Sequence, residues 1–341
     1  MPRVVLAPDK FRGTADAPSV VAAMGGAAAG LGWEVTALPM SDGGEGLLDA
    51  CAIAYPGLAT TTVTGPAGRP IAAEWRFGGD TAVVESARAS GLGLAGGVEG
   101  NDPLAATSEG TGELIVAAAR QVGPGGTVVV GLGGSASTDG GLGAVRAVEQ
   151  AGGLAGITLV VACDVDVPFA DAAPWFAPQK GAGPDEVAVL VRRLDRLADE
   201  YRRRYGVDVA GLAGAGAAGG LGGGLAALGG RLQSGYGLVR DLVGLVDALA
   251  GADRVVTGEG ALDATSFAGK VVGGVIDDAR GLGLPALVVA GRCTPAGESQ
   301  AVAAGCDVVS LIERFGPGPA VSDTAGCVAA ATAAWLGPAG I

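Results

Sequence analysis

The stretch TVVVGLGGSASTDGGLGA, residues 127–144, indicates the fold class of this protein. Its first five residues are apolar on nearly consecutive positions, which is typical of a strand that is covered on both faces. A glycine-rich loop (residues 132–141) follows, and a helical pattern begins at Gly141 or Leu142. A strand, a loop and a helix in this order are part of a βαβ unit, so the stretch predicts a parallel sheet with flanking helices.

The same pattern recurs at both ends of the chain. The runs are RVVLA (3–7), EVTAL (34–38), RVVTG (254–258), ALVVA (286–290) and DVVSL (307–311). Between them, residues 60–77 and 81–86 have the alternation and Gly/Pro turns of a hairpin, TLVVA at 158–162 returns to the βα pattern, and residues 185–205 form an amphipathic helix. We therefore predict a doubly wound parallel-sheet domain formed by residues 1–60 and 245–341, with a second α/β domain, residues 61–244, inserted into it.

Composition restricts the partners. The 341 residues carry a formal net charge of −13, which opposes binding to nucleic acid or to an anionic membrane. The N-terminal residues lack the apolar core of a signal peptide, and the glycine-rich run at 209–230 is a poor membrane span. The five cysteines are scattered without metal-binding or redox spacing, as expected for free thiols in the cytoplasm. Their positions are Cys51, Cys163, Cys293, Cys306 and Cys327.

The chain contains no histidine. This excludes Ser-His-Asp and Cys-His nucleophile systems, phosphohistidine chemistry and imidazole metal sites. Carboxylates, lysines, arginines and backbone amides must therefore carry out any chemistry.

The glycine-rich loop has three interpretations. Gly131, Gly133 and Ala136 nearly fit a dinucleotide fingerprint, but 64 glycines in the chain produce such strings by chance. The perfect strings at 91–96 and 214–219 do not follow a clear strand and open a helix with an acid about 20 residues on at a strand end. A phosphate site would use successive backbone N–H groups and the hydroxyls of the loop, with Asp139 reaching Mg²⁺. The third interpretation is a turn capped by its Ser, Thr or Asp side chains.

A repeated motif supplies clustered acids. DGGEGLLDA (42–50) and TGEGALDA (257–264) share GEGxLDA, and each follows a strand of the first domain. Because ligands bind at the carboxyl ends of parallel strands, we expect the two loops to bring their carboxylates together, as a metal site or a general base. The alternative is that one acid of each pair caps a helix. The four acids are Asp42, Glu45, Glu259 and Asp263.

Lysine is rare in this chain. Only Lys10, Lys180 and Lys270 are lysines among 22 basic residues, and all three lie in loop motifs. A compact ammonium suits a phosphate oxygen or a carboxylate in a tight pocket, although three surface lysines are the simpler alternative. In CDVDVPF (163–169), Asp164 is the acid that we expect to be functional, and Asp166 is a turn residue.

Taken together, the motifs resemble the bacterial glycerate kinases that are unrelated to P-loop kinases. APDKFRGT, PMSDGGEG, SASTDGG, CDVD-P, F-PQKGA, GAGAAGGLG, TGEG-LD and AGK occur in the order of that family, from about residue 4 to 335. The resemblance implies a flavodoxin-like domain with an inserted α/β domain. It also implies transfer of the ATP γ-phosphoryl group to D-glycerate, giving 2-phosphoglycerate.

The resemblance suggests roles for the candidate residues. The catalytic candidates are Lys10, Asp42, Glu259, Asp263 and Lys270. The substrate- and nucleotide-binding candidates are Arg12, Gly133, Gly134, Ser135, Ser137, Thr138, Gln179 and Lys180. The Mg²⁺ candidates are Asp42, Glu45, Asp139 and Asp164. ATP and D-glycerate are the expected partners, neither nucleic acid nor a membrane is expected, and a homodimer is left open.

Three departures from the family pattern concern the second domain and the first loop. Val167 replaces the usual Asn before Pro168, the segment after Pro168 is shortened, and Ala15-Asp16 replaces Leu-Ser. The position of phosphorylation and the assignment of base and metal ligands stay open. An NAD-dependent oxidoreductase of a small hydroxy acid and a non-catalytic metabolite-binding homologue are the alternatives.

Overall fold

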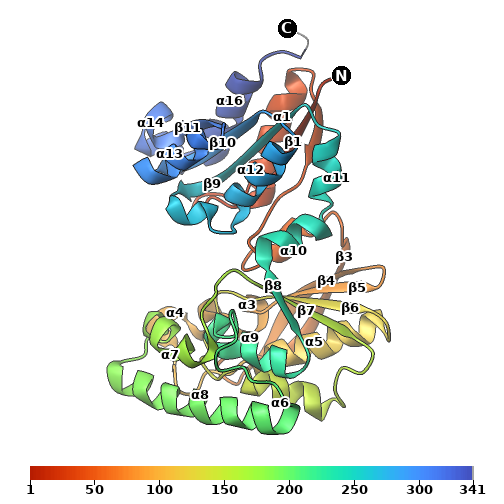
Figure 1. Cartoon of the computed structure of the whole chain (residues 1–341), viewed down its shortest axis with the longest axis vertical. Helices are drawn as coiled ribbons and strands as arrows, with labels where there is room; N and C mark the ends of the chain where they lie inside the picture. The colour runs from red at the N-terminus through yellow and green to blue at the C-terminus, as the bar shows by residue number, and fades with distance from the viewer. Residues whose placement is uncertain (340–341) are drawn as a thin grey trace. The chain divides into compact units, whose positions relative to one another are not determined.

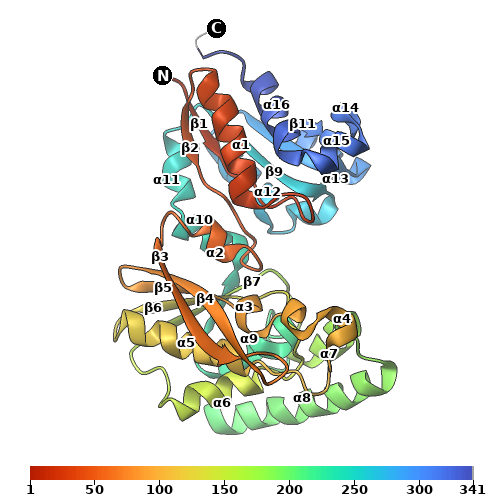
Figure 2. The ribbon, with the colours of Figure 1, turned by 180° about the vertical axis from the view of Figure 1, so that it is seen from behind.

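The computed structural model describes residues 1–339, which form two compact units (Figures 1 and 2). The first unit contains residues 1–42, 49–51 and the chain from 236 onwards, and the second contains residues 43–48 and 52–235. We had placed the boundaries at residues 60 and 244. The structure places β3 (Gly57–Thr64) wholly in the second unit, because all eight of its residues pair with the next strand. It places residues 236–244 in the first unit, where Tyr236 donates to Asp278.

The first unit is built on a parallel sheet of five strands. They are β1 (Arg3–Leu6), β2 (Glu34–Ala37), β9 (Arg254–Leu262), β10 (Ala286–Cys293) and β11 (Asp307–Ser310). Their spatial order is β2-β1-β9-β10-β11, and all four pairings are parallel. This is the flavodoxin-like order 2-1-3-4-5, so the predicted fold of this unit is confirmed.

Helices cover the two faces of this sheet. Alternate strand residues such as Val4 and Leu6 pack with α1 and α16, whereas α12 and α13 pack against β9 and β10 (Figures 1 and 2). Burial on both faces explains why these strands are continuous apolar runs. The helices of the unit are α1 (Ala17–Gly30), α10 (Gly235–Leu242), α11 (Leu245–Ala250), α12 (Val271–Gly281), α13 (Pro295–Ala303), α14 (Leu311–Phe315), α15 (Pro317–Ser322) and α16 (Thr324–Leu336), with α2 (Leu47–Ala50) at the division and the 3₁₀ turn η4 (Ala264–Phe267).

The second unit is built on a mixed sheet of six strands in sequential order from β3 to β8. After β3 come β4 (Pro70–Gly78), β5 (Thr81–Glu85), β6 (Thr127–Gly131), β7 (Thr158–Cys163) and β8 (Arg231–Ser234). The first three strands are antiparallel, as the Gly/Pro turns predicted, and β5 to β8 are parallel. The sequence pattern did not predict β8, because RLQS is short and mostly exposed.

Helices of the second unit form two hydrophobic clusters. One combines the sheet with α5, α6 and α9, and the other lies along α8, whose Leu190, Leu194, Leu197 and Tyr201 are buried as the predicted amphipathic pattern requires. The helices are α3 (Ala87–Ser90), α4 (Gly97–Gly100), α5 (Glu109–Val122), α6 (Leu142–Gln150), α7 (Ala172–Phe176), α8 (Pro184–Tyr205) and α9 (Ala217–Ala227), with 3₁₀ turns η1 (Leu92–Ala95), η2 (Phe169–Asp171) and η3 (Pro178–Lys180). Among the described residues, no helix has the length and apolarity to cross a membrane.

Candidate functional site

In the first unit, the candidate residues gather at the carboxyl ends of the neighbouring strands β1 and β9. β1 and β9 are neighbours but lead to opposite sides of the sheet, which makes their carboxyl ends a topological switch point. Ligands of open α/β sheets bind at such points. The Asp9 N–H donates to the Gly258 carbonyl at 2.9 Å, so the loop after β1 runs along β9 and lies beside Glu259.

Glycines permit this close approach. A Cβ on Gly258 would lie 2.2 Å from the Val289 oxygen of β10, and a Cβ on Gly260 would lie 3.0 Å from the Arg12 nitrogen. β9 continues through TGEGAL to Leu262 and pairs with β10 as far as Cys293. We had expected Glu259 to lie in a loop; it lies instead in a strand that is fixed on both sides.

Glu259 is a partly buried acid of this group. Its Oε1 atom is buried and has no hydrogen-bond partner within residues 1–339. Burial raises the pKa of Glu259 to about 7, and the Ser266 hydroxyl only partly offsets this. A carboxyl group with a pKa near 7 can accept and return a proton at neutral pH, so Glu259 has the properties of a general base.

Asp9, Lys10 and Asp42 lie together beside it. The Lys10 Nζ atom is 3.9 Å from Asp9 Oδ1 and 4.0 Å from Asp42 Oδ1, and all three side chains are mostly buried. Burial raises the pKa of Asp9 to about 6, while Lys10 lowers it and the Asp42 charge raises it further. Arg12 is exposed on the same loop. Sequence reasoning missed Asp9, although its place in APDK, between a strand and a rare lysine, was a usable signal.

Asp263 and Lys270 flank the group but have different tasks. Asp263 caps η4 by accepting hydrogen bonds from the Thr265 N–H (2.7 Å) and the Thr265 hydroxyl (2.6 Å), which lower its pKa. This is the capping alternative for the second GEGxLDA motif. The Lys270 Nζ atom donates to Thr265 Oγ1 at 3.2 Å, and its charge acts on both Asp263 and Glu259. Glu259, rather than Asp263, is therefore the candidate base.

In the second unit, the glycine-rich loop has both open and buried polar groups. No described residue accepts the backbone N–H of exposed Gly134 or of Ser135. The hydroxyls of Ser137 and Thr138 are buried and have no hydrogen-bond partner within residues 1–339. An anion such as a phosphate can use the N–H of exposed Gly134 directly, whereas Ser135 is 4% exposed, so its N–H and the two hydroxyls become accessible only if the loop moves.

Lys180 supports this loop from beneath. The side chain is 4% exposed, and its Nζ atom donates to Ser135 Oγ (2.9 Å) and to the Ser137 carbonyl (2.5 Å). Burial lowers the pKa of Lys180 to about 7, although the Asp139 charge opposes this. The backbone is left-handed at residues 218–220 of α9, and a Cβ on Gly219 would lie 2.8 Å from Nζ. We had expected Lys180 to meet a phosphate or a carboxylate; its contacts show an ammonium that organises the loop. Gln179, beside it, is exposed.

Asp139 is a cap. It accepts hydrogen bonds from the Ser108 N–H and hydroxyl and from the N–H groups of Gly141 and Gly143 at the start of α6. Both carboxylate oxygens are therefore occupied by donors. This is the capping interpretation of the loop, and a metal bond to Asp139 would break these contacts.

The first GEG loop (residues 43–48) belongs to the second unit, whereas Glu259 and Asp263 of the second motif belong to the first unit. A Cβ on Gly131 would lie 2.4 Å from the Gly43 oxygen, and a Cβ on Gly133 would lie 3.2 Å from the Gly44 Cα, so the loop lies directly against the glycine-rich loop. Glu45 is exposed on it. We had expected both GEGxLDA loops to lie in one domain.

The predicted metal ligands do not form a ready-made site. Asp42 lies in the first unit, and Glu45, Asp139 and Asp164 lie in the second. Within residues 1–339, no group of three or more acidic or cysteine side chains lies close enough together to hold a metal ion. Mg²⁺ usually takes only one or two carboxylates and completes its shell with phosphate oxygens and water. Asp42, next to Asp9, fits that mode, and Asp139 does not.

Comparisons with known proteins identify the family of this chain. The model of the glycerate kinase family matches residues 4–151 and 148–334. An uncharacterized Mycobacterium bovis protein is 41% identical over 85% of this chain and 79% of its own length. The glycerate 2-kinase of Escherichia coli K12 is 36% identical over 86% of each chain. A crystal structure assigned to glycerate kinase 2 of Salmonella typhimurium LT2 superimposes with a TM-score of 0.81 at 32% identity, covering 98% of both chains. Because these matches span nearly the whole chain, this protein belongs to the glycerate kinase family.

Proposed function

We propose that this chain transfers the γ-phosphoryl group of ATP to the 2-hydroxyl of D-glycerate, giving 2-phosphoglycerate and ADP. Family membership supports the reaction class, and a relative named glycerate 2-kinase supports the 2-position. The observation that carries the proposal is Glu259 at a switch point of the sheet: its Oε1 atom is buried with no partner within residues 1–339, and its pKa is about 7.

Glu259 is the proposed general base. It accepts the proton of the glycerate hydroxyl while that oxygen forms its bond to the γ-phosphorus and the bond to the β-phosphate oxygen of ADP breaks. The proton then leaves Glu259 for solvent. No covalent intermediate with the enzyme is needed, because phosphoryl transfer relies on positioning and charge stabilisation.

Cationic groups of the first unit bind the anions in this proposal. Lys10 and Lys270 are close enough to the acids to act on them electrostatically, and Arg12 is exposed on the loop after β1. The glycerate carboxylate and the transferring phosphoryl group both carry negative charge, which an ammonium stabilises in a partly desolvated site.

The glycine-rich loop of the second unit is the proposed phosphate cradle. Exposed Gly134 supplies an N–H donor without a competing acceptor, the N–H of buried Ser135 follows it, and Lys180 fixes the backbone of both. Asp42 is the proposed protein ligand of Mg²⁺. When bound with ATP, Mg²⁺ neutralises charge on the phosphate oxygens.

Phosphorus NMR of the reaction product tests the proposal. The purified chain is incubated with ATP, Mg²⁺ and D-glycerate, with an otherwise identical sample lacking glycerate as the control. A resonance that coincides with authentic 2-phosphoglycerate is expected. A 3-phosphoglycerate resonance would overturn the position, and ADP that does not increase with glycerate would indicate a non-catalytic metabolite-binding protein.

A further inference from the structure

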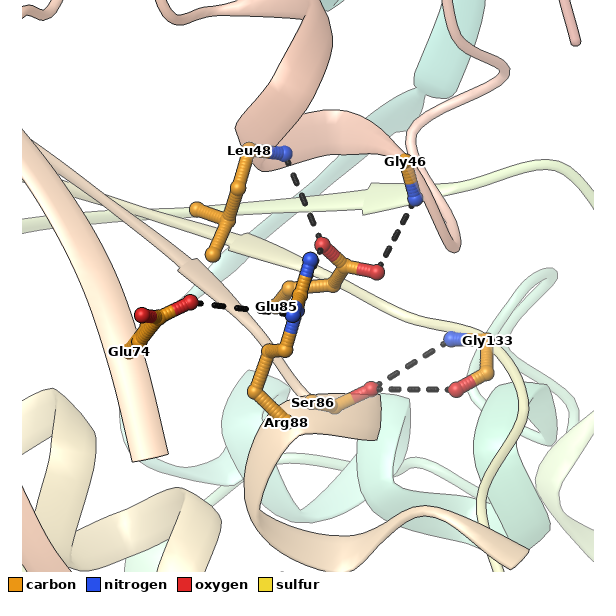
Figure 3. Close-up of polar contacts among 7 residues, drawn as sticks. All are labelled: Gly46, Leu48, Glu74, Glu85, Ser86, Arg88 and Gly133. Carbon is orange, nitrogen blue, oxygen red and sulfur yellow. Dashed lines mark hydrogen bonds and ion pairs between the residues drawn. The ribbon is translucent and has the colours of Figure 1, made fainter. Parts of the chain in front are cut away.

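Two consecutive residues at the end of β5 contact both glycine loops of the second unit (Figure 3). Glu85 is the last residue of the strand, and Ser86 follows it. They point to different partners: Glu85 to the first GEG loop and Ser86 to the glycine-rich loop. Both side chains are buried, at 1% and 0% exposure.

Glu85 holds the first GEG loop through its backbone. Glu85 Oε1 accepts a hydrogen bond from the Gly46 N–H at 3.0 Å, and Oε2 accepts a longer one from the Leu48 N–H at 3.5 Å. Arg88 Nε lies 3.7 Å from Oε2 and compensates the buried charge. The outer side of Arg88 faces Glu74 at 3.8 Å, so the carboxylate is backed by a short chain of charges that leads to the surface (Figure 3).

Ser86 holds the glycine-rich loop. Its hydroxyl accepts from the Gly133 N–H at 3.3 Å and donates to the Gly133 carbonyl at 3.4 Å. Gly133 directly precedes Gly134, whose exposed N–H belongs to the proposed phosphate cradle. A one-residue spacing along β5 therefore fixes the separation of the two loops.

The two loops also pack against each other without side chains between them. A Cβ on Gly131 would lie 2.4 Å from the Gly43 oxygen, and a Cβ on Gly43 would lie 2.8 Å from the Ala162 Cβ of β7. The first GEG loop thus lies over the carboxyl ends of β6 and β7. Such close backbone contact sets the distance between the two loops but provides few directional bonds. The polar contacts of Glu85 and Ser86 therefore determine how the loops are aligned with each other.

We propose that Glu85 and Ser86 are positioning residues of the phosphoryl transfer reaction, which fix the first GEG loop against the phosphate cradle. The proposal rests on the proposed function, because it gives the reason why the loop must be held. Gly43 and Gly44 of the loop lie directly against Gly131 and Gly133, so the shape of the cradle depends on where the loop is anchored. Neither Glu85 nor Ser86 contacts substrate in this proposal.

Glu85→Gln is the informative variant. Glutamine has nearly the same shape, but one carboxylate oxygen becomes an NH₂ donor. It then faces either the Gly46 N–H, or the Leu48 N–H and Arg88, and none of these groups can accept from it. The buried negative charge that pairs with Arg88 is also lost. Glu74→Gln is the matched control, because it removes a carboxylate from the same charge chain at a half-exposed side chain of β4.

Hydrogen exchange measures the anchoring without relying on catalysis. In Glu85→Gln, amide exchange in a peptide covering residues 43–48 is expected to accelerate at least tenfold, whereas exchange in β6 and α8 stays within twofold of wild type. In Ser86→Ala, the acceleration is expected around residues 132–135 instead. Unchanged exchange at both loops would overturn the proposal, and so would acceleration throughout the second unit, which would indicate general destabilisation.

Steady-state kinetics then tests the role in the reaction. We expect Glu85→Gln to lower kcat at least tenfold with KM for glycerate within threefold of wild type, and Glu74→Gln to keep both within twofold. Normal kcat in Glu85→Gln despite a loosened loop would overturn the positioning role. A wild-type protein that does not phosphorylate glycerate would instead overturn the proposed function, while the exchange result still tests whether the two residues anchor the loops.

Discussion

At the scale of single residues, Glu259 shows how burial creates chemistry. A carboxylate in a desolvated site is costly, and a protein normally supplies hydrogen bonds to its oxygens. Glu259 Oε1 has none among residues 1–339. Asp263 follows Glu259 closely along the chain, yet its pKa is lowered because Thr265 donates hydrogen bonds to it. The two acids of one motif are thereby separated into a base and a cap.

Glu259→Gln is expected to lower kcat by about 10²- to 10⁴-fold, the usual contribution of a general base. In the wild-type protein, kcat/KM should rise with pH and level off above about 7, because the base must be deprotonated and its pKa is about 7. A coupled ADP assay between pH 5.5 and 9 measures both. Asp263→Asn serves as the comparison, and a larger loss there than in Glu259→Gln would contradict the assignment.

Glu259→Gln should lower activity but increase the stability of the folded protein at high pH. Burial raises the pKa of folded Glu259 from 4.5 to about 7, so the folded state holds this proton more tightly than the unfolded state does. The stabilisation is present below pH 4.5 and is lost as pH rises through 7. At pH 8, Glu259→Gln should therefore increase the free energy of unfolding by roughly 1–3 kcal/mol. Urea unfolding at pH 5 and pH 8 checks this, and a variant that is less stable at pH 8 would refute it.

Lys180 should give the reverse pH dependence. Burial lowers its pKa from 10.5 to about 7, so the unfolded state binds the proton more tightly and the free energy of unfolding rises between pH 7 and 10.5. The slope is at most about 1.4 kcal/mol per pH unit. Urea unfolding at pH 7, 8 and 9 should show this rise in wild type and a smaller one in Lys180→Met. Identical slopes in the two proteins would show that the buried lysine does not titrate in this range.

At the scale of elements, glycine lets strands and loops approach where function needs rigidity. β9 is held between the loop after β1 and strand β10, and neither side leaves space for a Cβ on Gly258 or Gly260. The polar end of β9 is consequently as fixed as its apolar start. This arrangement supports Glu259 without using a side-chain contact.

Gly258→Ala is therefore expected to destabilise the protein by about 1–3 kcal/mol, the usual cost of overpacking, because its Cβ would lie 2.2 Å from the Val289 oxygen. Gly26→Ala is the matched control. Gly26 is exposed inside α1 with nothing within 4 Å of a built Cβ, and alanine there should stabilise by about 0.5–1 kcal/mol. Thermal unfolding followed by circular dichroism compares the two, and equal midpoints would count against the packing argument.

At the scale of the whole molecule, the described residues contain no cluster of three acids that could hold a metal by itself. The negative net charge attracts cations only diffusely. Mg²⁺ should therefore bind together with the nucleotide. This differs from a resident metal centre, which would stabilise the protein without ATP.

We expect 5 mM Mg²⁺ alone to leave the melting temperature within about 1 °C. Mg²⁺ with ATP at 100 times its dissociation constant should add about 2.7 kcal/mol of stability. Differential scanning fluorimetry measures both, with ATP and EDTA as the control for nucleotide without metal. A large shift from Mg²⁺ alone would reveal a metal site that the proposal lacks.

Most of the fold was predicted from the sequence, by the periodicity of its apolar residues and the order of its predicted strands and helices. Each apolar run that we placed at 3–7, 34–38, 127–131, 158–162, 254–258, 286–290 and 307–311 is a strand, because doubly covered parallel strands are recognisable from local composition. It failed at β8, which is short and exposed, and at the unit boundaries, which depend on strand pairing between distant segments. The candidate residues of the site were named mainly from their motifs. Their tasks differ within a motif, as the contacts of Glu259 and Asp263 show.

The sequence by itself determined the fold class, the family and the set of rare lysines and clustered acids, since these depend on residue type and spacing along the chain. Only the tertiary structure decided which acid has a buried oxygen without a donor, that Lys180 lies under a loop, and that the first GEG loop is held by Glu85 of the second unit. The physical reason is that desolvation and hydrogen bonding depend on which groups surround a side chain. Those groups come from segments that lie 39 to 250 residues away in the chain.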